Sequence, residues 1–175
     1  MQSAITAVLA TVGAALARAQ YAQTVRPVLG YTGRAVAGLA PNDQLAWACH
    51  LLNGAQDVAV TSEVSYWVVF TPAALSDSAS DSTHWGTSQE AIASMETRGL
   101  VHREDFELNF IGQGRPIPAQ GNLFLGWLTE KAMREVENVF VKVHVVDRVG
   151  DTHERVVNLL RGANRTPRHP DAPRF

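Results

Sequence analysis

The 175 residues include a single cysteine, Cys49, so the chain cannot form an internal disulfide or a cysteine-rich zinc site. Charged residues are also scarce, at 18% of the sequence against about 25% in a typical soluble domain. Hydrophobic residues make up 46%, which excludes disorder of the whole chain. The 15 basic and 17 acidic side chains nearly cancel, so we predict no nucleic-acid partner.

The sequence also lacks the short motifs that mark common enzymes. It contains no Gly-x-Ser-x-Gly elbow, no P-loop, no Gly-x-Gly-x-x-Gly and no His-Glu-x-x-His. Its six histidines are scattered, and no pair has the spacing of metal ligands on a helix. We therefore predict no catalysis, no cofactor and no metal. A small hydrolase or metal enzyme with an unrecognised site is the minor alternative.

The N-terminal segment, residues 1–26, has no charged side chain before Arg18. A helix from Ser3 to Arg26 would be about 34 Å long at ~1.5 Å per residue, enough to cross a bilayer core. Many of its residues are alanine, which adds little insertion energy. Ala15-Leu16-Ala17 resembles a signal-peptide cleavage site, but the basic residues expected in front of it are missing.

The bulky residues of this segment follow helical spacing and would share one face. We predict that they form a membrane anchor: Ile5, Val8, Leu9, Val12 and Leu16. Small residues at four-residue intervals, Thr6, Ala10 and Ala14, would let two such helices associate into a homo-oligomer. Two alternatives are cleavage of the segment and an alanine-rich helix that packs on protein. Arginines follow the apolar run and none precedes it, which predicts a cytoplasmic location for the domain that comes next.

Beyond Pro27 the apolar residues alternate, as in strands with one buried face. We predict a mainly β domain over residues 27–160 with about seven short strands. The expected strands cover residues 45–51, 58–70, 106–110, 122–128, 139–146 and 152–160, the second being two short strands or one bent strand. The last two would form a hairpin in which His144 lies opposite Glu154 as a cross-strand charge pair.

Two short helices interrupt this pattern. Thr87 and Glu90 have capping-box spacing, and the helix that they begin should stop near Gly99, while a second helical turn is expected over 129–136. Residues 71–99 form an insertion that contains a polar low-complexity loop at 76–82. His84 and Trp85 follow this loop directly. We predict both as partner contacts, because aromatic anchors dominate interface energetics; the alternative is that Trp85 covers the edge of the sheet body.

The last residues, 161–175, hold four arginines and three prolines. We predict that they form a tail. If the tail is cytoplasmic, its arginines could contact anionic lipid headgroups.

A resemblance supports the same organisation. The run Leu51 to Gly54, followed by Asp57-Val58-Ala59-Val60 and Val64-Ser65-Tyr66, resembles the opening strands of immunoglobulin-like β-sandwich domains in short bacterial membrane-anchored proteins. The closing hairpin, 143–157, is similar to the last hairpin of those domains, which also follow one apolar helix and an Arg-Pro. The resemblance implies an immunoglobulin-like antiparallel β-sandwich and implies no chemistry. The insertion at 71–99 is longer than such a loop requires.

The expected function is therefore a non-enzymatic, membrane-anchored interaction module with its β domain in the cytoplasm. It would bind a protein partner through the β-sandwich and the 71–99 insertion. The main alternative is a structural subunit of a larger assembly, of the virion or secretion type, that self-associates through the N-terminal helix.

Overall fold

The computed structural model describes the backbone of residues 2–72 and 84–172, and the side chains of residues 11–72 and 84–172. The helices are α1 (Gln2–Val25), α2 (Ser88–Glu96) and α3 (Glu130–Glu135), with a 3₁₀ turn at Pro41–Asp43. The strands are β1 (Leu29–Val36), β2 (Ala46–Asn53), β3 (Ala59–Phe70), β4 (Phe106–Leu108), β5 (Pro116–Ile117), β6 (Gly121–Thr129), β7 (Val136–Val146) and β8 (Thr152–Asn158).

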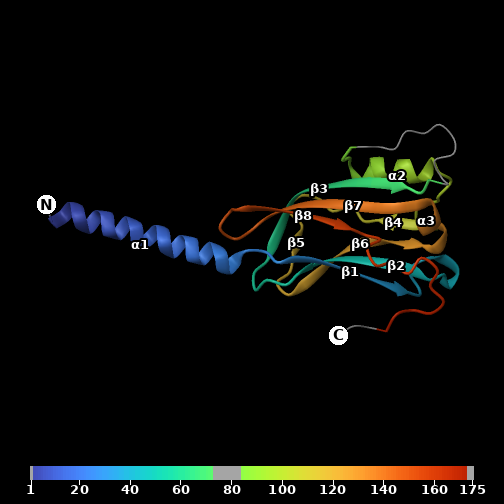
Figure 1. The fold of residues 1–175 in the computed structure, drawn as a ribbon, viewed down its shortest axis with the longest axis horizontal. Helices are drawn as coiled ribbons and strands as arrows, with labels where there is room; N and C mark the ends of the chain where they lie inside the picture. Colours follow the sequence, from blue (N-terminus) through green and yellow to red (C-terminus); the bar gives the residue numbers. More distant parts are fainter. Residues whose placement is uncertain (1, 73–83, 173–175) are drawn as a thin grey trace.

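The strands form two four-stranded antiparallel sheets, which confirms the mainly β prediction (Figure 1). Sheet A has the order β1-β2-β6-β4 and sheet B the order β5-β3-β7-β8. Alternate residues of each strand enter the core between the sheets. On β7 the valines at 139, 141, 143 and 145 are fully buried, while the residues between them face outward.

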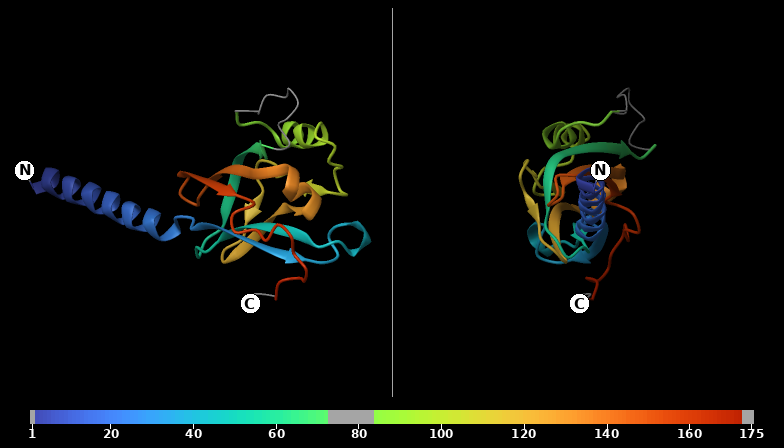
Figure 2. Two further views of the ribbon diagram at one scale, coloured as in Figure 1. Left: turned by 45° about the vertical axis from the view of Figure 1, so that its right-hand side comes forward. Right: turned by 90° about the vertical axis from the view of Figure 1, so that its left-hand side faces the viewer.

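α1 stands clear of this body as a straight rod (Figures 1 and 2). Every described side chain from Thr11 to Gln20 is exposed, and only Val25, at the end of the helix, is buried against the body. Of the predicted anchor residues, Val12 is 51% and Leu16 60% exposed, while the side chains of the other three, Ile5, Val8 and Leu9, lie outside the described part of the structure. No helix among the described residues has both the length and the hydropathy needed to span a bilayer, so the predicted transmembrane helix gains no support.

The capping box of α2, the glycine that follows this helix and the register of the last hairpin appear where the sequence predicted them. Thr87 and Glu90 form a capping box at the start of α2, with Glu90 N donating to Thr87 Oγ1 at 3.2 Å and Thr87 N donating to Glu90 Oε2 at 2.6 Å. Gly99 follows α2 with a φ of 75°. β7 and β8 pair with His144 opposite Glu154, as predicted. β3 is one strand with a register shift between Thr61 and Glu63.

Two expectations need correction, the number of strands and the position of Phe110. β1 and β5 were not expected, and they raise the number of strands in the described residues to eight. Phe110 was expected to be buried on an alternating strand, but β4 ends at Leu108 and Phe110 is 76% exposed. Its predecessor Asn109 is held in place by hydrogen bonds: its side chain donates to Phe124 O, and its carbonyl accepts from Tyr66 Oη.

The described part of the C-terminal segment, residues 161–172, lies along the body and is tied to it (Figure 2). The Arg165 guanidinium donates to three backbone carbonyls, those of Met133, Val136 and Glu137. This arginine is therefore a structural contact and not one of the lipid contacts considered above. Asp171 N donates to Ala35 O, and Ala35 N donates to Asp171 Oδ2, each at 2.8 Å.

Candidate functional site

Aromatic side chains gather on the outer face of sheet B. Trp67 of β3 and Phe140 of β7 lie opposite one another in register, with ring centroids 5.2 Å apart in a stacked arrangement. Trp85 meets Trp67 edge to face at 6.0 Å, and Lys142 Nζ lies 4.6 Å from the centroid of the Trp85 ring. We call Trp67, Trp85, Phe140 and Lys142 the aromatic patch. All four side chains are half-buried, so each keeps part of its surface accessible.

The position of Trp85 follows from backbone pairing. Gly86 N donates to Tyr66 O and Tyr66 N donates to Gly86 O, both at 2.8 Å, so this segment adds a short bridge to the outer edge of β3. The capping box of α2 begins immediately afterwards. These two fixed points hold the indole of Trp85 over the face of the sheet. Residues 73–83, which contain the whole of the predicted polar loop at 76–82, lie outside the described residues.

The two predicted partner contacts therefore differ in position. The ring of Trp85 packs on the outer face of β3 and β7 and stays partly accessible. It therefore covers the sheet, as one alternative expected, and keeps a surface that a partner could contact, as the other expected. His84 is exposed beside it. Beyond Lys142 the same face becomes polar: His144 Nε2 lies 2.9 Å from Glu154 Oε2, and His144 Nδ1 lies 4.0 Å from Glu63 Oε2. An aromatic centre with a charged rim is the usual organisation of a protein-binding surface.

A second feature is a groove of about 910 Å³ between the edge of sheet A at β1 and the edge of sheet B at β8. Its size is within the range of ligand-binding clefts, about 300–1,000 Å³. Three exposed arginines line it: Arg34 on β1, Arg155 on β8, and Arg161 just after β8. None of the three makes an ion pair with a described residue. We call this the arginine groove.

The floor of the arginine groove is a hydrogen-bonded cluster that joins the two sheets. Leu159 O accepts from Trp47 Nε1 at 2.8 Å, from Cys49 Sγ at 3.3 Å and from the hydroxyl of Tyr31. Trp47 Nε1 also lies 3.1 Å from the Tyr31 hydroxyl. Gly33 leaves room for this cluster, because a Cβ there would lie 2.4 Å from Trp47 Cζ2.

The thiol and the phenol in this floor are poor candidates for chemistry. Burial raises the pKa of Cys49 to about 12, so the thiol stays protonated at neutral pH and is a weak nucleophile. Burial also raises the pKa of Tyr31, and the adjacent Cys49 raises it further. The Cys49 side chain is fully buried, as expected for a cysteine that acts as a small hydrophobic residue.

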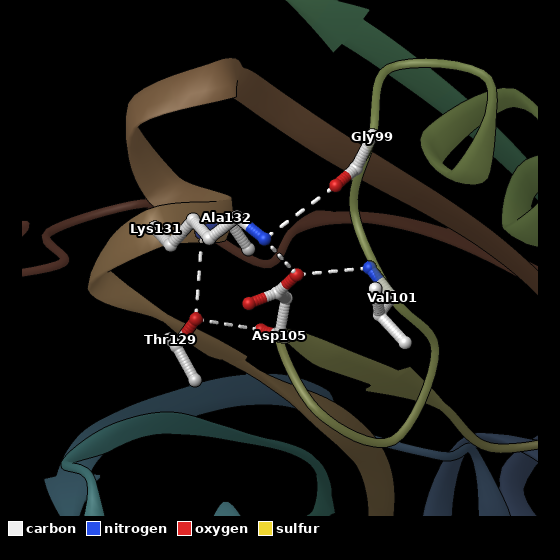
Figure 3. Close-up of polar contacts among 6 residues, drawn as sticks. All are labelled: Gly99, Val101, Asp105, Thr129, Lys131 and Ala132. Atoms are coloured by element: carbon white, nitrogen blue, oxygen red, sulfur yellow. Dashed lines mark hydrogen bonds and ion pairs between the residues drawn. The ribbon is translucent and has the colours of Figure 1, made fainter.

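A third polar cluster, around Asp105, is structural (Figure 3). Asp105 Oδ2 accepts from Lys131 Nζ at 2.6 Å and from Val101 N at 2.9 Å, and Asp105 O accepts from Thr129 Oγ1 at 2.8 Å. Lys131 Nζ also reaches Gly99 O at 3.5 Å. These contacts tie the loop after α2 to the start of α3. The polar groups of Asp105, Thr129 and Lys131 thus serve to hold the loop in place. Elsewhere in residues 11–72 and 84–172, no three histidine, cysteine or acidic side chains converge as metal ligands would.

Sequence reasoning did not identify the arginine groove. Arg34, Arg155 and Arg161 belong to three separate segments that meet only because the two sheets pack face to face. β1 itself was not expected, so no local pattern placed Arg34 at a sheet edge.

The class that the fold defines is an antiparallel two-sheet β-sandwich preceded by a free-standing helix. Comparison of the chain with protein-family models, curated proteins and solved structures finds no match.

Proposed function

We propose that this protein is a non-enzymatic interaction module held at a membrane by α1, with its β-sandwich, of immunoglobulin-like type, binding a protein partner in the cytoplasm. The observation that carries the proposal is the exposed rod of α1 (Figure 1). Its side chains from Thr11 to Gln20 are all exposed, and of its described residues only Val25, at the end next to the body, is buried. A Val or Leu side chain gains about 1.5–3 kcal/mol when it moves from water to an apolar environment.

The charge distribution of α1 favours a lipid environment for its N-terminal part. No charged side chain precedes Arg18, and Arg26 follows the helix. Helix ends in membrane proteins carry arginine at the lipid–water boundary, with an excess on the cytoplasmic side. The proposal requires α1 to lie in or on the bilayer and does not require it to span.

The membrane part is tested by flotation of the full chain with liposomes that contain anionic lipid. We expect the wild-type chain to float and the double variant Val12→Glu, Leu16→Glu to stay at the bottom of the gradient. The matched control is Gln20→Glu, Gln23→Glu, which adds the same charge to the same helix nearer the body. Wild-type chain that sediments as a soluble monomer refutes membrane anchoring. A defined homo-oligomer that forms without lipid supports the alternative of a self-associating structural subunit.

The partner surface that we favour is the aromatic patch. Tryptophan and phenylalanine supply large contact areas at low entropic cost, and Lys142 over the Trp85 ring adds a charge at the centre of the surface. The patch also adjoins the 71–99 insertion through Trp85 and Gly86, so both features would act on the same partner.

This part is tested by affinity capture from membrane extracts, followed by a binding titration with the purified protein that is captured. We expect Trp85→Ala to weaken binding by about 2 kcal/mol or more, as for a central aromatic anchor. Phe110→Ala is the matched control, because Phe110 is an exposed aromatic residue that follows β4 of sheet A, whereas the patch lies on sheet B. Equal binding by wild type and Trp85→Ala, or a larger loss with Phe110→Ala, excludes the aromatic patch as the partner surface.

A further inference from the structure

β1 is a sheet edge with free backbone groups. Gly54 N donates to Val28 O, so the even-numbered residues of this strand direct their backbone groups toward β2. The odd-numbered residues therefore direct theirs away from the sheet. Ala35 confirms this alternation, because its N–H and carbonyl both bond to Asp171 on the open side. Tyr31 and Gly33 have the same orientation, and both line the arginine groove.

The opposite wall of the groove is a second sheet edge. Leu159 N donates to Val139 O, so by the same alternation Val157 and Arg155 face β7, while the backbone groups of Asn158 and Val156 face away from the sheet. The groove thus lies between two sheet edges, although on the β8 side the Asn158 carbonyl already accepts from Arg161 N at 3.2 Å. Exposed strand edges are templates for pairing with another chain.

The positive charge of the groove indicates which kind of peptide segment would bind there. Arg34 lies on the outer face of sheet A, and Arg155 and Arg161 lie across the groove on the β8 side. A strand added to β1 would alternate its side chains between the outer face, beside Arg34, and the groove. Acidic residues on such a strand would therefore meet arginine on both faces, and Arg–carboxylate contacts are among the strongest hydrogen bonds in proteins.

The C-terminal segment of the protein already bonds to this edge of β1. Asp171 is the one acidic residue among the groove lining, and it bonds to β1 at Ala35 through both its backbone and its carboxylate. An acidic residue thus occupies the outward-facing backbone groups of Ala35, and its carboxylate accepts from the Ala35 N–H. The next free positions, Gly33 and Tyr31, are bonded to no backbone group of a described residue.

We propose that the arginine groove binds an extended acidic segment of a partner protein, which adds as a strand to the free edge of β1 at Gly33 and Tyr31. Backbone hydrogen bonds to β1 supply affinity, and Arg34, Arg155 and Arg161 select carboxylate side chains. Of the four residues of the aromatic patch, only Phe140 also lines the groove, and this binding site does not depend on the membrane proposal.

The test uses the full chain in uncharged detergent micelles and a short synthetic peptide of alternating glutamate and valine that carries a fluorescent label. Anisotropy is measured at low and high salt, with inorganic phosphate as a competitor. We expect saturable binding that weakens as salt rises. The double variant Arg155→Glu, Arg161→Glu should weaken binding about tenfold or more. Arg115→Glu should leave binding unchanged, because this exposed arginine lies at the far edge of sheet B and forms no ion pair with a described residue.

A second peptide separates strand addition from simple anion binding. The same sequence, N-methylated at every other residue on the edge that would face β1, keeps its charges and loses its hydrogen-bond donors. We expect it to lose binding, and we expect the unmethylated peptide to shift the amide NMR signals of Gly33 and Tyr31. The proposal is overturned if neither peptide binds, or if both bind equally. It is also overturned if phosphate displaces the peptide completely, or if self-association of the chain covers this edge and blocks the peptide.

Discussion

The substitution Gly33→Ala tests the packing that closes the sandwich beneath the arginine groove. A Cβ at Gly33 would lie 2.4 Å from Trp47 Cζ2 and 2.6 Å from the Tyr31 hydroxyl oxygen. Both groups are held by Leu159 O, so neither can move without straining that bond. Forcing extra volume into a packed site costs about 1–3 kcal/mol.

Gly30, on the same strand, is the matched control. A Cβ there would make an ordinary contact, 3.7 Å from Leu52 Cβ. Replacing glycine by alanine within a strand otherwise removes chain entropy from the unfolded state, which is worth about 0.5–1 kcal/mol. We expect Gly30→Ala to have unchanged or slightly higher stability and Gly33→Ala to lose about 1–3 kcal/mol.

The assay is urea unfolding followed by far-ultraviolet circular dichroism. The Gly33→Ala change is then repeated in a Trp47→Phe background, which removes the part of the indole that the new Cβ would meet. We expect the cost of Gly33→Ala to fall by about 0.5–3 kcal/mol there, the usual range for coupled neighbours. Equal stabilities for the Gly30 and Gly33 variants, or an unchanged cost in the Trp47→Phe background, would refute the packing argument.

Three further outcomes are expected. Gly126→Ala should destabilise the fold by at least about 3 kcal/mol, because Gly126 has a φ of 144° and its Cβ would lie 2.0 Å from Glu107 O; urea unfolding measures this. Burial alone raises the pKa of Asp147, but hydrogen bonds from His153 and two backbone amides outweigh it and lower the pKa. The stabilisation by Asp147 is thus present at neutral pH and lost below pH ~4, so Asp147→Ala should cost about 1–3 kcal/mol at pH 7 and less in acid. Burial and the charge of Arg34 lower the pKa of His50, so Arg34→Gln should raise it in an NMR titration.

Local patterns predicted the parts of this fold that local interactions determine. The capping box places the start of α2, and the alternation of the last hairpin places His144 opposite Glu154. In both cases the partners lie ten residues apart or fewer, so spacing alone brings them together. The aromatic patch was partly foreseen through Trp85. Its contacts with Trp67 and Lys142 depend on the backbone bridge between Gly86 and Tyr66, which no motif marks.

The missed elements are those that long-range packing creates. β1 carries two glycines, which weaken the strand signal, and the need for glycine at position 33 arises only because Trp47 crosses beneath it. Residues 161–175 have the composition of a tail. In the structure, however, Arg165 donates to three carbonyls around the end of α3, and Asp171 bonds to the edge of β1. Such contacts depend on groups about 30 to 136 residues away in sequence, beyond any local pattern.

The order of α1 and β1 also limits what can reach the arginine groove. Three residues, Arg26 to Val28, separate the end of the helix from the first residue of the strand. At ~3.3 Å per extended residue, Gly33 lies at most about 26 Å from the end of α1. With α1 in or on a bilayer, as we propose, the free edge of β1 is held within that distance of the lipid surface. The acidic segment that pairs with it must then come from the membrane-proximal part of a partner, which favours another membrane protein over a freely diffusing one.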